Sequence, residues 1–576
     1  MKHFFATLVV VGTLGFPCAS AQSLLPHGLT AVEKAQLSQF TFRHAALTPP
    51  PTTAVRAAAE WEEVEYLVVS WQPGFQNILR QIVAVGVTEC KVIITTQNQA
   101  SVANYLTANS VPLTNVIFMD APADSIWIRD YAGNTVYAND VGELALTDWI
   151  YNRPRPNDNA MPSAHATQVG IPIYITDSGT NDLVNTGGNY MSDGMGNAFA
   201  SNLILDENAV GNPYGVSAKT EAQINQIMLD YMGIARYVKM PTLPYDEIHH
   251  IDMHMKLLDE QTLLVSKYPP GVADGPQIEA NIDYVTANFL SPFGTPYKIE
   301  WIDAPPSTGG AFPDTGGAYR TYSNSVIVNK SILVPVYRPE VDAAALAKYQ
   351  QLMPGYNVVG IDVDNPGENL INLLGAIHCI THTIGVADPL WIVHQPIAEA
   401  NAGQTVTINA TIKHQSGIAW SKVFWRETGS TAFNEVPMIL LDNDIWTADI
   451  PIPNPGVDVE YYIGSSSMSG KTLTRPLPAP AGYWTIDVQM LSTEAWAATH
   501  IAGPYPNPAR DKVNFNFGQI GAVDVTITNT LGQTLSRQSI DGNGLFTLEL
   551  QSDWKGTLFV LFEGAFGQVT RKVVKL

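Results

Sequence analysis

A lone cysteine and a histidine cluster carry the residue types best suited to catalysis in this chain. Cys379 lies in an apolar run that predicts a strand, where a buried and inert thiol is the ordinary interpretation. Residues His249–His254 lead straight into a predicted strand, and side chains two apart on a strand share a face, so His250, Asp252 and His254 are expected to point together. That face suits a metal site, a general acid/base histidine beside a carboxylate, or a polar strand end. The same histidine and carboxylate could activate the thiol as a nucleophile.

Two carboxylates, a guanidinium group and an indole lie close together from Asp124 to Asp130. Trp127 and Arg129 stand between the two acidic residues, in a mostly apolar neighbourhood. Such a cluster either binds a ligand or forms an internal Arg129 salt bridge beside a core tryptophan. These residues alone favour neither interpretation.

Two arginines, Arg153 and Arg155, alternate with prolines in the stretch Tyr151–Pro156. Proline favours extended backbone, which puts both guanidinium groups on one side. Two convergent guanidinium groups form a strong fork for a carboxylate, and a solvated loop is the alternative.

These residues fall between Trp61 and about Asp388, where short strand-like runs alternate with amphipathic helical patterns. The alternation predicts an α/β domain, and hairpin-like pairs near residues 259–261 and 329–331 predict antiparallel strands as well. The expected strands are 66–71, 91–96, 116–120, 202–205, 255–267 and 324–337, and the expected helices are 75–85, 220–232, 276–289 and 342–353.

Helical periodicity disappears after Trp391, and strand-like alternation replaces it. About seven short strands within residues 389–490 predict an immunoglobulin-like sandwich. Residues 491–576 read as a linker followed by a small all-β domain. Neither module offers residues for catalysis, so residues 51–388 are expected to form the catalytic domain.

The N-terminus has the pattern of a secretory signal peptide at residues 1–21, with an apolar run too short to span a membrane. Removal of the signal leaves Cys90 and Cys379, which either pair or include a free thiol. Residues 22–50 read as a leader or linker with a stiff proline-rich end, and a removable pro-segment is one interpretation.

The composition excludes several classes of function. The chain has 576 residues, with 31 Lys+Arg against 53 Asp+Glu, and a net charge of −22. This charge repels phosphate backbones and no basic run offsets it, so no nucleic-acid partner is expected. The glycine pairs follow neither the dinucleotide nor the Walker spacing, so no nucleotide site is implied.

In their order, the motifs resemble those of the agmatine deiminase and bacterial peptidylarginine deiminase family. The resemblance covers roughly residues 55–385 and rests on Ala59–Glu62, Asp124–Asp130, Gly187–Asn189, His250–Asp252, Tyr322–Ser325 and Ile377–Thr381. It implies the guanidine-modifying α/β fold, a five-bladed propeller of ββαβ-like units around a central site.

The C-terminal stretch is similar to the sorting domain of the type IX secretion system. The similarity rests on Tyr505–Pro508, Gly532–Gln533 and the basic end Lys572–Leu576. It implies a secretion machinery as partner and export across the outer membrane of a gram-negative bacterium, followed by release or surface attachment.

The family resemblance also implies roles for single residues. Cys379 would be the nucleophile, His250 the general acid/base, and Asp130 and Asp252 the carboxylates that hold a guanidinium group. Asn324 matches a catalytic-site position near the nucleophile, where it would orient the Cys379 loop or a substrate carbonyl.

Substrate binding is expected to involve Trp127, Asp124, Arg153 and Arg155. Trp127 would flank the flat cation through its π-face. Agmatine has no carboxylate for a paired-arginine fork, so C-terminal arginine of peptides or proteins is the favoured substrate. The resemblance therefore implies a secreted hydrolase of amidine C–N bonds (EC 3.5.3 type) that converts peptidyl arginine to citrulline through a covalent thiouronium intermediate.

No cofactor or catalytic metal is predicted, and the absence of an EF-hand pattern predicts calcium-independent activity. A structural cation on surface carboxylates is compatible with this prediction. Three alternatives stay open: an agmatine deiminase-type hydrolase of small guanidines, a metal-dependent hydrolase centred on His250, Asp252 and His254, and a non-catalytic module that binds arginine-bearing ligands.

Overall fold

The computed structural model describes residues 24–42, 48–176, 179–453, 457–489, 497 and 500–576. The predicted signal peptide, with Cys18, and most of the predicted linker at 492–501 lie outside them. Within the described residues, no helix is both long and apolar enough to cross a membrane.

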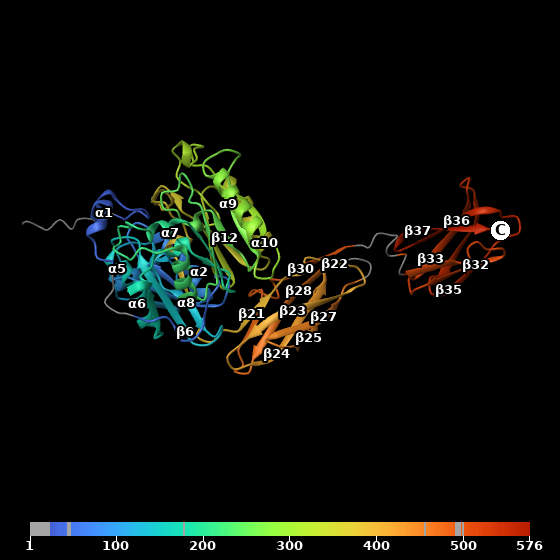
Figure 1. Cartoon of the computed structure of the whole chain (residues 1–576), viewed down its shortest axis with the longest axis horizontal. Coiled ribbons are helices and arrows are strands. Elements are labelled where there is room, and N and C mark those ends of the chain that lie inside the picture. Colours follow the sequence, from blue (N-terminus) through green and yellow to red (C-terminus); the bar gives the residue numbers. More distant parts are fainter. Residues whose placement is uncertain (1–23, 43–47, 177–178, 454–456, 490–496, 498–499) are drawn as a thin grey trace, which may run out of the picture.

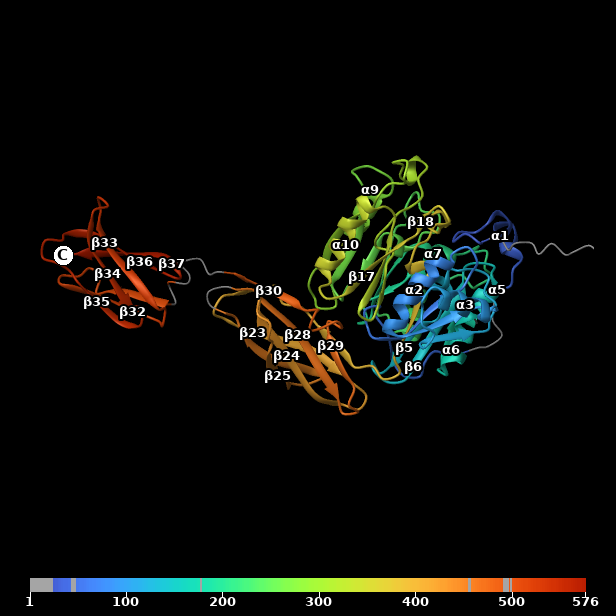
Figure 2. The ribbon, with the colours of Figure 1, turned by 180° about the vertical axis from the view of Figure 1, so that it is seen from behind.

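Three bodies follow one another along the chain in both ribbon views (Figure 1, Figure 2). The first is a mixed α/β body that ends with β20 (His382–Gly385). Two β-rich bodies follow, which begin at β21 (Trp391–His394) and β31 (Ile501–Tyr505). The predicted order, an α/β region before a β-rich C-terminal region, is confirmed.

Five small sheets of the α/β body share one connectivity. In each sheet an antiparallel pair of strands is extended by a parallel strand. The sheets consist of β1 (Val55–Ala57), β5 (Asn134–Ala138), β6 (Leu144–Tyr151), β7 (Ile173–Thr176) and β8 (Val184–Asn185); of β9 (Met191–Ser192), β10 (Asn197–Ser201) and β11 (Arg236–Met240); of β12 (Met255–Leu257), β13 (Thr262–Lys267) and β14 (Lys298–Asp303); of β15 (Val326–Val328), β16 (Ser331–Val336) and β17 (Asn357–Asp362); and of β20, β2 (Val64–Ser70), β3 (Lys91–Thr95) and β4 (Val116–Met119). A two-stranded ladder, β18 (Asp364–Asn365) with β19 (Glu368–Asn369), is separate from them.

Helices connect the parallel strands, because a parallel pair needs a crossover that a tight turn cannot provide. In α2 (Gln76–Glu89) the apolar residues Ile78, Leu79, Ile82 and Val83 form one buried face. The other helices in this body are α3 (Gln99–Ala108), α4 (Ile128–Tyr131), α5 (Pro156–Asn159), α6 (Met161–Val169), α7 (Leu203–Glu207), α8 (Glu221–Met232), α9 (Gly275–Asn288) and α10 (Pro339–Leu352).

The last strand of this body returns to the first sheet of the chain. β20 pairs antiparallel with β2, so Leu67 lies opposite Thr383 and Val68 opposite His382. This pairing fixes the turn before β20, which carries Cys379, against strands that are far away in the sequence.

The four predicted helices are present with ends shifted by a few residues, and both predicted hairpins are confirmed. The strand predicted at 202–205 is wrong. Residues Leu203–Glu207 form helix α7, and the strand β10 directly precedes them. A short apolar run does not distinguish a buried helix from a strand by itself.

In the second body, two packed sheets share a single apolar core that includes Ile408, Ile450, Val423 and Ile463. One sheet contains β21, β23 (Thr405–Lys413), β27 (Ile445–Pro451) and β26 (Ile439–Leu440); the other contains β22 (Glu399–Asn401), β30 (Trp484–Gln489), β28 (Val459–Ser467), β24 (Ile418–Glu427), β25 (Asn434–Pro437) and β29 (Thr472–Arg475).

The third body has the same two-sheet design around a core of its own, which includes Phe515, Phe517, Val525 and Phe562. Its sheets are β31, β32 (Lys512–Phe517) and β35 (Gly544–Glu549), and β34 (Thr534–Asp541), β33 (Ala522–Asn529), β36 (Gly556–Gly564) and β37 (Gly567–Lys575).

A buried ion pair joins the first and second bodies. Arg475 Nη2 donates to Glu260 Oε2 at 3.1 Å, and only 11% and 4% of the two side chains are exposed. Burial raises the pKa of Glu260 to about 7, although Arg475 opposes this shift. Removal of the arginine therefore leaves a carboxyl group that is costly to ionise.

We expect Arg475→Ala to lower the free energy of unfolding by about 3 kcal/mol. A buried acid with a raised pKa favours the folded state only while it is protonated, so the loss should grow as the pH rises from 5 to 8. Denaturant unfolding of the full chain, followed by tryptophan fluorescence, measures the effect. The matched control is Lys422→Ala, which breaks an exposed pair with Glu435 and should cost less than about 1 kcal/mol; equal losses in both variants would contradict the prediction.

Candidate active site

Three short turns bring the predicted catalytic residues together. Asp130 lies in α4, Asp252 in the 3₁₀ turn η4 (Ile251–Met253), and Cys379 in the 3₁₀ turn η7 (His378–Ile380). The side chains of Asp130, Asp252 and Cys379 are buried.

The strand predicted to follow His254 begins at Met255, but the shared strand face predicted for His250, Asp252 and His254 is wrong, as is the strand predicted around Cys379. His250 precedes the turn η4, and the strand β12 begins only at Met255. His249 has φ +58°, a left-handed conformation that ends the extended backbone. The side chains therefore converge on the site from separate turns. They do not lie one after another along the face of a single strand.

The nucleophile candidate is held by an amide. Asn324 Nδ2 donates to Cys379 Sγ at 3.3 Å and to the main-chain oxygen of Asp252 at 3.2 Å. The main-chain N–H of His378 donates to Asn324 Oδ1 at 3.1 Å. Asn324 therefore connects the two turns that carry Cys379 and Asp252.

A histidine directly before η4 and a carboxylate in α4 face each other. His250 Nδ1 lies 3.5 Å from Asp130 Oδ1, and both side chains are fully buried. Burial lowers the pKa of His250 to about 4, so the imidazole is neutral at physiological pH. A Cβ atom on Gly188 would lie 2.4 Å from His250 Nδ1 and 3.1 Å from Asp130 Oδ1, so only glycine permits this approach.

Two further residues support the site, and sequence reasoning did not assign them. His378 Nδ1 contacts Asp252 Oδ2 at 2.6 Å, and its Nε2 contacts Glu60 Oε2 at 2.7 Å. Both ring nitrogens face carboxylates, so His378 links Asp252 to Glu60 and orients Asp252. Glu60 also pairs with Lys256 and, at 3.8 Å, with Arg129. The available signals were the position of His378 beside Cys379 and that of Glu60 in the first motif.

The thiol of Cys379 is protonated in this arrangement. Burial and the nearby carboxylates of Asp252 and Asp130 raise the pKa of Cys379 well above its usual value. Asp130 Oδ1, Asp252 Oδ1 and His250 Nε2 are buried and have no hydrogen-bond partner within the described part of the chain. A ligand with several N–H donors and a positive charge would satisfy these atoms and also lower the pKa of the thiol.

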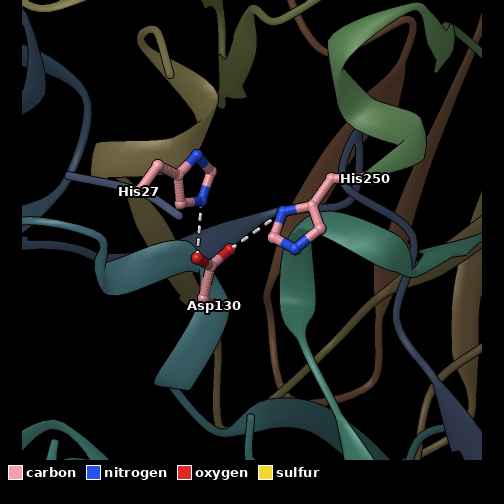
Figure 3. Close-up of side chains that lie close together, drawn as sticks. All are labelled: His27, Asp130 and His250. Carbon is pink, nitrogen blue, oxygen red and sulfur yellow. Dashed lines mark hydrogen bonds and ion pairs between the residues drawn. The ribbon is translucent and has the colours of Figure 1, made fainter. Parts of the chain in front are cut away.

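A residue from the N-terminal segment enters this site. His27 Nε2 lies 2.6 Å from Asp130 Oδ2, on the other oxygen from the one that faces His250. Figure 3 shows Asp130 between the two imidazole rings. The ring of His27 stacks on Trp127 with 4.4 Å between centroids and 13° between planes. Nothing in the sequence around His27 pointed to this position.

The paired arginines contact the same segment. Arg153 Nε donates to the main-chain oxygen of His27 at 3.2 Å, and Arg155 forms an ion pair with Glu33 at 2.8 Å. Both guanidinium groups therefore point to one side, as predicted. The carboxylate of Asp124 instead accepts from the main-chain and side-chain N–H groups of Asn157, so it positions the backbone beyond the arginines.

The predicted metal set of His250, Asp252 and His254 does not converge. Among the described residues, one trio has ligand atoms within 4.8 Å of one another, and it consists of His27, Asp130 and His250. Its 2.6 Å contact is too short for two ligands of one tetrahedral zinc, whose ligand atoms lie about 3.3 Å apart. A hydrogen bond fits this trio better than an ion. Both described cysteines, Cys90 and Cys379, are free, so the predicted alternative of a disulfide is wrong.

We expect the Cys379 thiol to react slowly with iodoacetamide at pH 7 and faster as the pH rises above 9. Asp252→Asn removes a negative charge beside the sulfur, so it should lower the thiol pKa and raise the rate at pH 7 about tenfold. Alkylation is followed by mass spectrometry in a Cys18→Ser/Cys90→Ser background. A pH-independent rate, or a slower reaction of Asp252→Asn, would contradict this account.

Two family models match the chain. The Porphyromonas-type peptidyl-arginine deiminase model matches residues 56–384, and the secretion system C-terminal sorting domain model matches residues 504–576. The first match covers more than half of the chain and contains Asp130, His250, Asp252, Asn324 and Cys379. The second match confirms the predicted type IX sorting domain.

Curated relatives and a solved structure agree with the first match. The protein named "Putative agmatine deiminase" from Yersinia pseudotuberculosis is 26% identical over 301 residues, which cover 47% of this chain and 78% of that protein. A protein of the same name from Shewanella baltica is 27% identical over 305 residues, with 48% and 78% covered. The crystal structure of the "Putative Arginine Deiminase from Porphyromonas gingivalis" shares the fold, with a TM-score of 0.50, 19% identity, and 58% of this chain and 99% of that chain covered. The chain therefore belongs to the Porphyromonas-type peptidyl-arginine deiminase family, hydrolases that act on C–N bonds.

Proposed function

We propose that this enzyme is a secreted cysteine hydrolase that converts arginine at the C-terminus of peptides or proteins to citrulline and ammonia. One observation carries the proposal. A flat, nitrogen-bearing side chain lies between Trp127 and Asp130, while Arg153 holds the main-chain carbonyl of that same residue, His27. The site therefore accepts a planar, nitrogen-bearing group and the main-chain carbonyl of the same residue.

Carboxylates prepare the substrate for attack. The guanidinium carbon is a poor electrophile because its charge is spread over three nitrogens. Asp130 and Asp252 would bind those nitrogens, orient the group and stabilise charge that localises as the carbon becomes tetrahedral. Binding of the cation also offsets the two carboxylates that raise the thiol pKa, so Cys379 ionises when substrate arrives.

The reaction then proceeds in two halves. The thiol proton passes to neutral His250, and the sulfur of Cys379 bonds to the guanidinium carbon. The imidazolium, stabilised by Asp130, returns the proton to the departing nitrogen, so the C–N bond breaks and ammonia leaves. Water then attacks the S-alkylthiouronium carbon while His250 accepts its proton. The C–S bond then breaks as the hydroxyl proton of the intermediate passes to the sulfur, which yields the ureido group and restores the thiol. His250 returns to its neutral form by releasing its proton to water.

Arg153 and Arg155 support the choice of substrate. Two buried guanidinium groups on the main-chain side of the cation site would be wasted on agmatine, which has no carboxylate. A C-terminal arginine offers a carboxylate at the position where Arg153 binds the carbonyl of His27. Charge-assisted contacts of this kind are stronger than contacts to a neutral carbonyl, which favours the C-terminal residue over an internal one.

The remaining parts of the proposal concern the architecture and the address. We infer that the five sheets are the blades of a propeller closed by the pairing of β20 with β2, and that the second body is an immunoglobulin-like module. Catalysis uses protein groups alone and needs no calcium. The sorting domain directs the enzyme through the outer membrane, either to the cell surface or to the medium.

We expect Cys379→Ala to lose at least about 10⁴-fold in kcat, because no other group can form the covalent intermediate. The measurement is ammonia and citrulline release in the His27→Ala background, where the cation site is open, with and without a metal chelator. Cys90→Ser is the control and should keep full activity. A fully active Cys379→Ala enzyme, or activity lost to the chelator, would overturn the mechanism.

The carboxylate fork is tested with four substrates: a peptide that ends in arginine, the same peptide with arginine internal, free arginine and agmatine. In the His27→Ala background, where the cation site is open, we expect Arg153→Gln to raise KM for the C-terminal peptide about 100-fold, a loss of about 2.7 kcal/mol, because it leaves the carboxylate without its partner. Turnover of agmatine should change less than threefold. Equal losses on all four substrates, or a wild-type preference for agmatine, would contradict the proposed specificity.

A further inference from the structure

We propose that residues 24–42 hold this enzyme in a latent form, in which His27 occupies the guanidinium site as a tethered competitor of the substrate. The active form arises when the segment is displaced or removed. The identity of the excluded substrate rests on the proposed function, whereas the blocked site rests on contacts in the structure.

The imidazole ring of His27 lies where the proposed function places the guanidinium group of the substrate. His27 Nε2 lies 2.6 Å from Asp130 Oδ2, and Nδ1 lies 2.7 Å from the main-chain oxygen of Leu374. Both nitrogens face acceptors, and only the imidazolium form donates from both. Its ring stacks on Trp127 and meets the edge of His250 with 4.9 Å between centroids. A planar, nitrogen-bearing ring thus already lies between the predicted π-face and the predicted carboxylate.

Side chains of the α/β body donate hydrogen bonds to successive main-chain carbonyl groups of the segment. The carbonyl of Leu25 accepts from Trp127 Nε1 at 3.0 Å. Arg155 Nη2 donates to the carbonyls of Pro26, at 2.9 Å, and Gly28, at 3.2 Å. With the contact from Arg153 to His27, these bonds engage four successive carbonyl groups and both arginines of the proposed substrate fork.

The residues that follow His27 hold it in the site. Helix α1 (Ala31–Gln36) begins with a capping box between Thr30 and Glu33, and Glu33 also binds Arg155. Leu37 and Phe42 then pack in an apolar cluster with Ile150, Val184, Tyr214 and Val216. The order of this segment is established by folding, so His27 reaches the site without the entropy cost that a free ligand meets.

The segment is separable from the catalytic fold. It precedes the family match at residues 56–384, and the largest apolar core is built from residues 59–384. Thr52, Thr53 and Ala54 are exposed between the segment and β1. The chain can therefore be cut here without loss of a strand or of the main core. This places residues 25–28 of the predicted leader in the active site, where the sequence predicted only a linker or pro-segment.

The test compares the full wild-type chain with His27→Ala and with Gln39→Ala, a control at an exposed position of the same segment. A tethered competitor reduces the fraction of open enzyme and leaves the chemistry of that fraction intact. We therefore expect His27→Ala to lower KM for a peptide that ends in arginine at least tenfold, with kcat unchanged within twofold, and Gln39→Ala to match wild type. An unchanged KM in His27→Ala would overturn the proposal.

A second readout separates this proposal from the proposed function. Iodoacetamide alkylation of Cys379, in a Cys18→Ser/Cys90→Ser background, reports access to the site without any turnover. We expect it to be at least tenfold faster in His27→Ala. Faster alkylation with no citrulline from any variant would support the latent form and refute the deiminase assignment. Equal alkylation rates together with ordinary citrulline release from wild type would refute the latent form alone.

A cleavable chain provides the third arm. A protease site in place of residues 52–54 lets the folded protein be cut and the 24–42 peptide washed away. The value of kcat/KM should rise at least tenfold, and synthetic peptide 24–42 should restore inhibition in competition with substrate, whereas the same peptide with His27→Ala should not. Equal inhibition by both peptides, or no rise in activity after removal, would overturn the proposal.

Discussion

Two buried carboxylates without enough fixed positive charge determine the character of this site. His378 contacts Oδ2 of Asp252, but Oδ1 of Asp252 and Oδ1 of Asp130 have no hydrogen-bond partner among the described residues. Although burial alone would raise it, His27 and His250 hold the pKa of Asp130 below its usual range, so its charge persists. A buried anion of this kind demands a cation. The need to compensate this buried negative charge accounts for three features: the guanidinium substrate, the protonated resting thiol and the position of the His27 imidazole.

The fold places the residues of this site on short turns. Each turn presents its residue at the end or the start of a strand, and the pairing of β20 with β2 fixes Cys379 relative to the N-terminal sheet. Close approach at the centre then needs residues without side chains: a Cβ on Gly187 would lie 1.9 Å from the main-chain oxygen of Arg129. The glycine pair in the third motif is thus a packing requirement of the site.

Local patterns predicted much of the molecule, and contacts between distant residues account for what they missed. Apolar periodicity found the helices α2, α8, α9 and α10, and the ordered motifs placed Cys379, His250, Asp130, Asp252 and Asn324 in one site. Alternation misled at His249–His254, because a left-handed residue interrupts a pattern that otherwise reads as a strand. His27 was beyond reach, since its role depends on contacts with Asp130, 103 residues away, and Leu374, 347 residues away.

The central claim is that Cys379 bonds to the guanidinium carbon of an arginine substrate. The most direct measurement is intact-mass and peptide mass spectrometry of the His27→Ala chain, acid-quenched within milliseconds of mixing with a peptide that ends in arginine. The account predicts an adduct on Cys379 with the mass of the peptide less one ammonia, and its absence in Cys379→Ala. Citrulline formed at full rate with no adduct on Cys379 at any time point would contradict it.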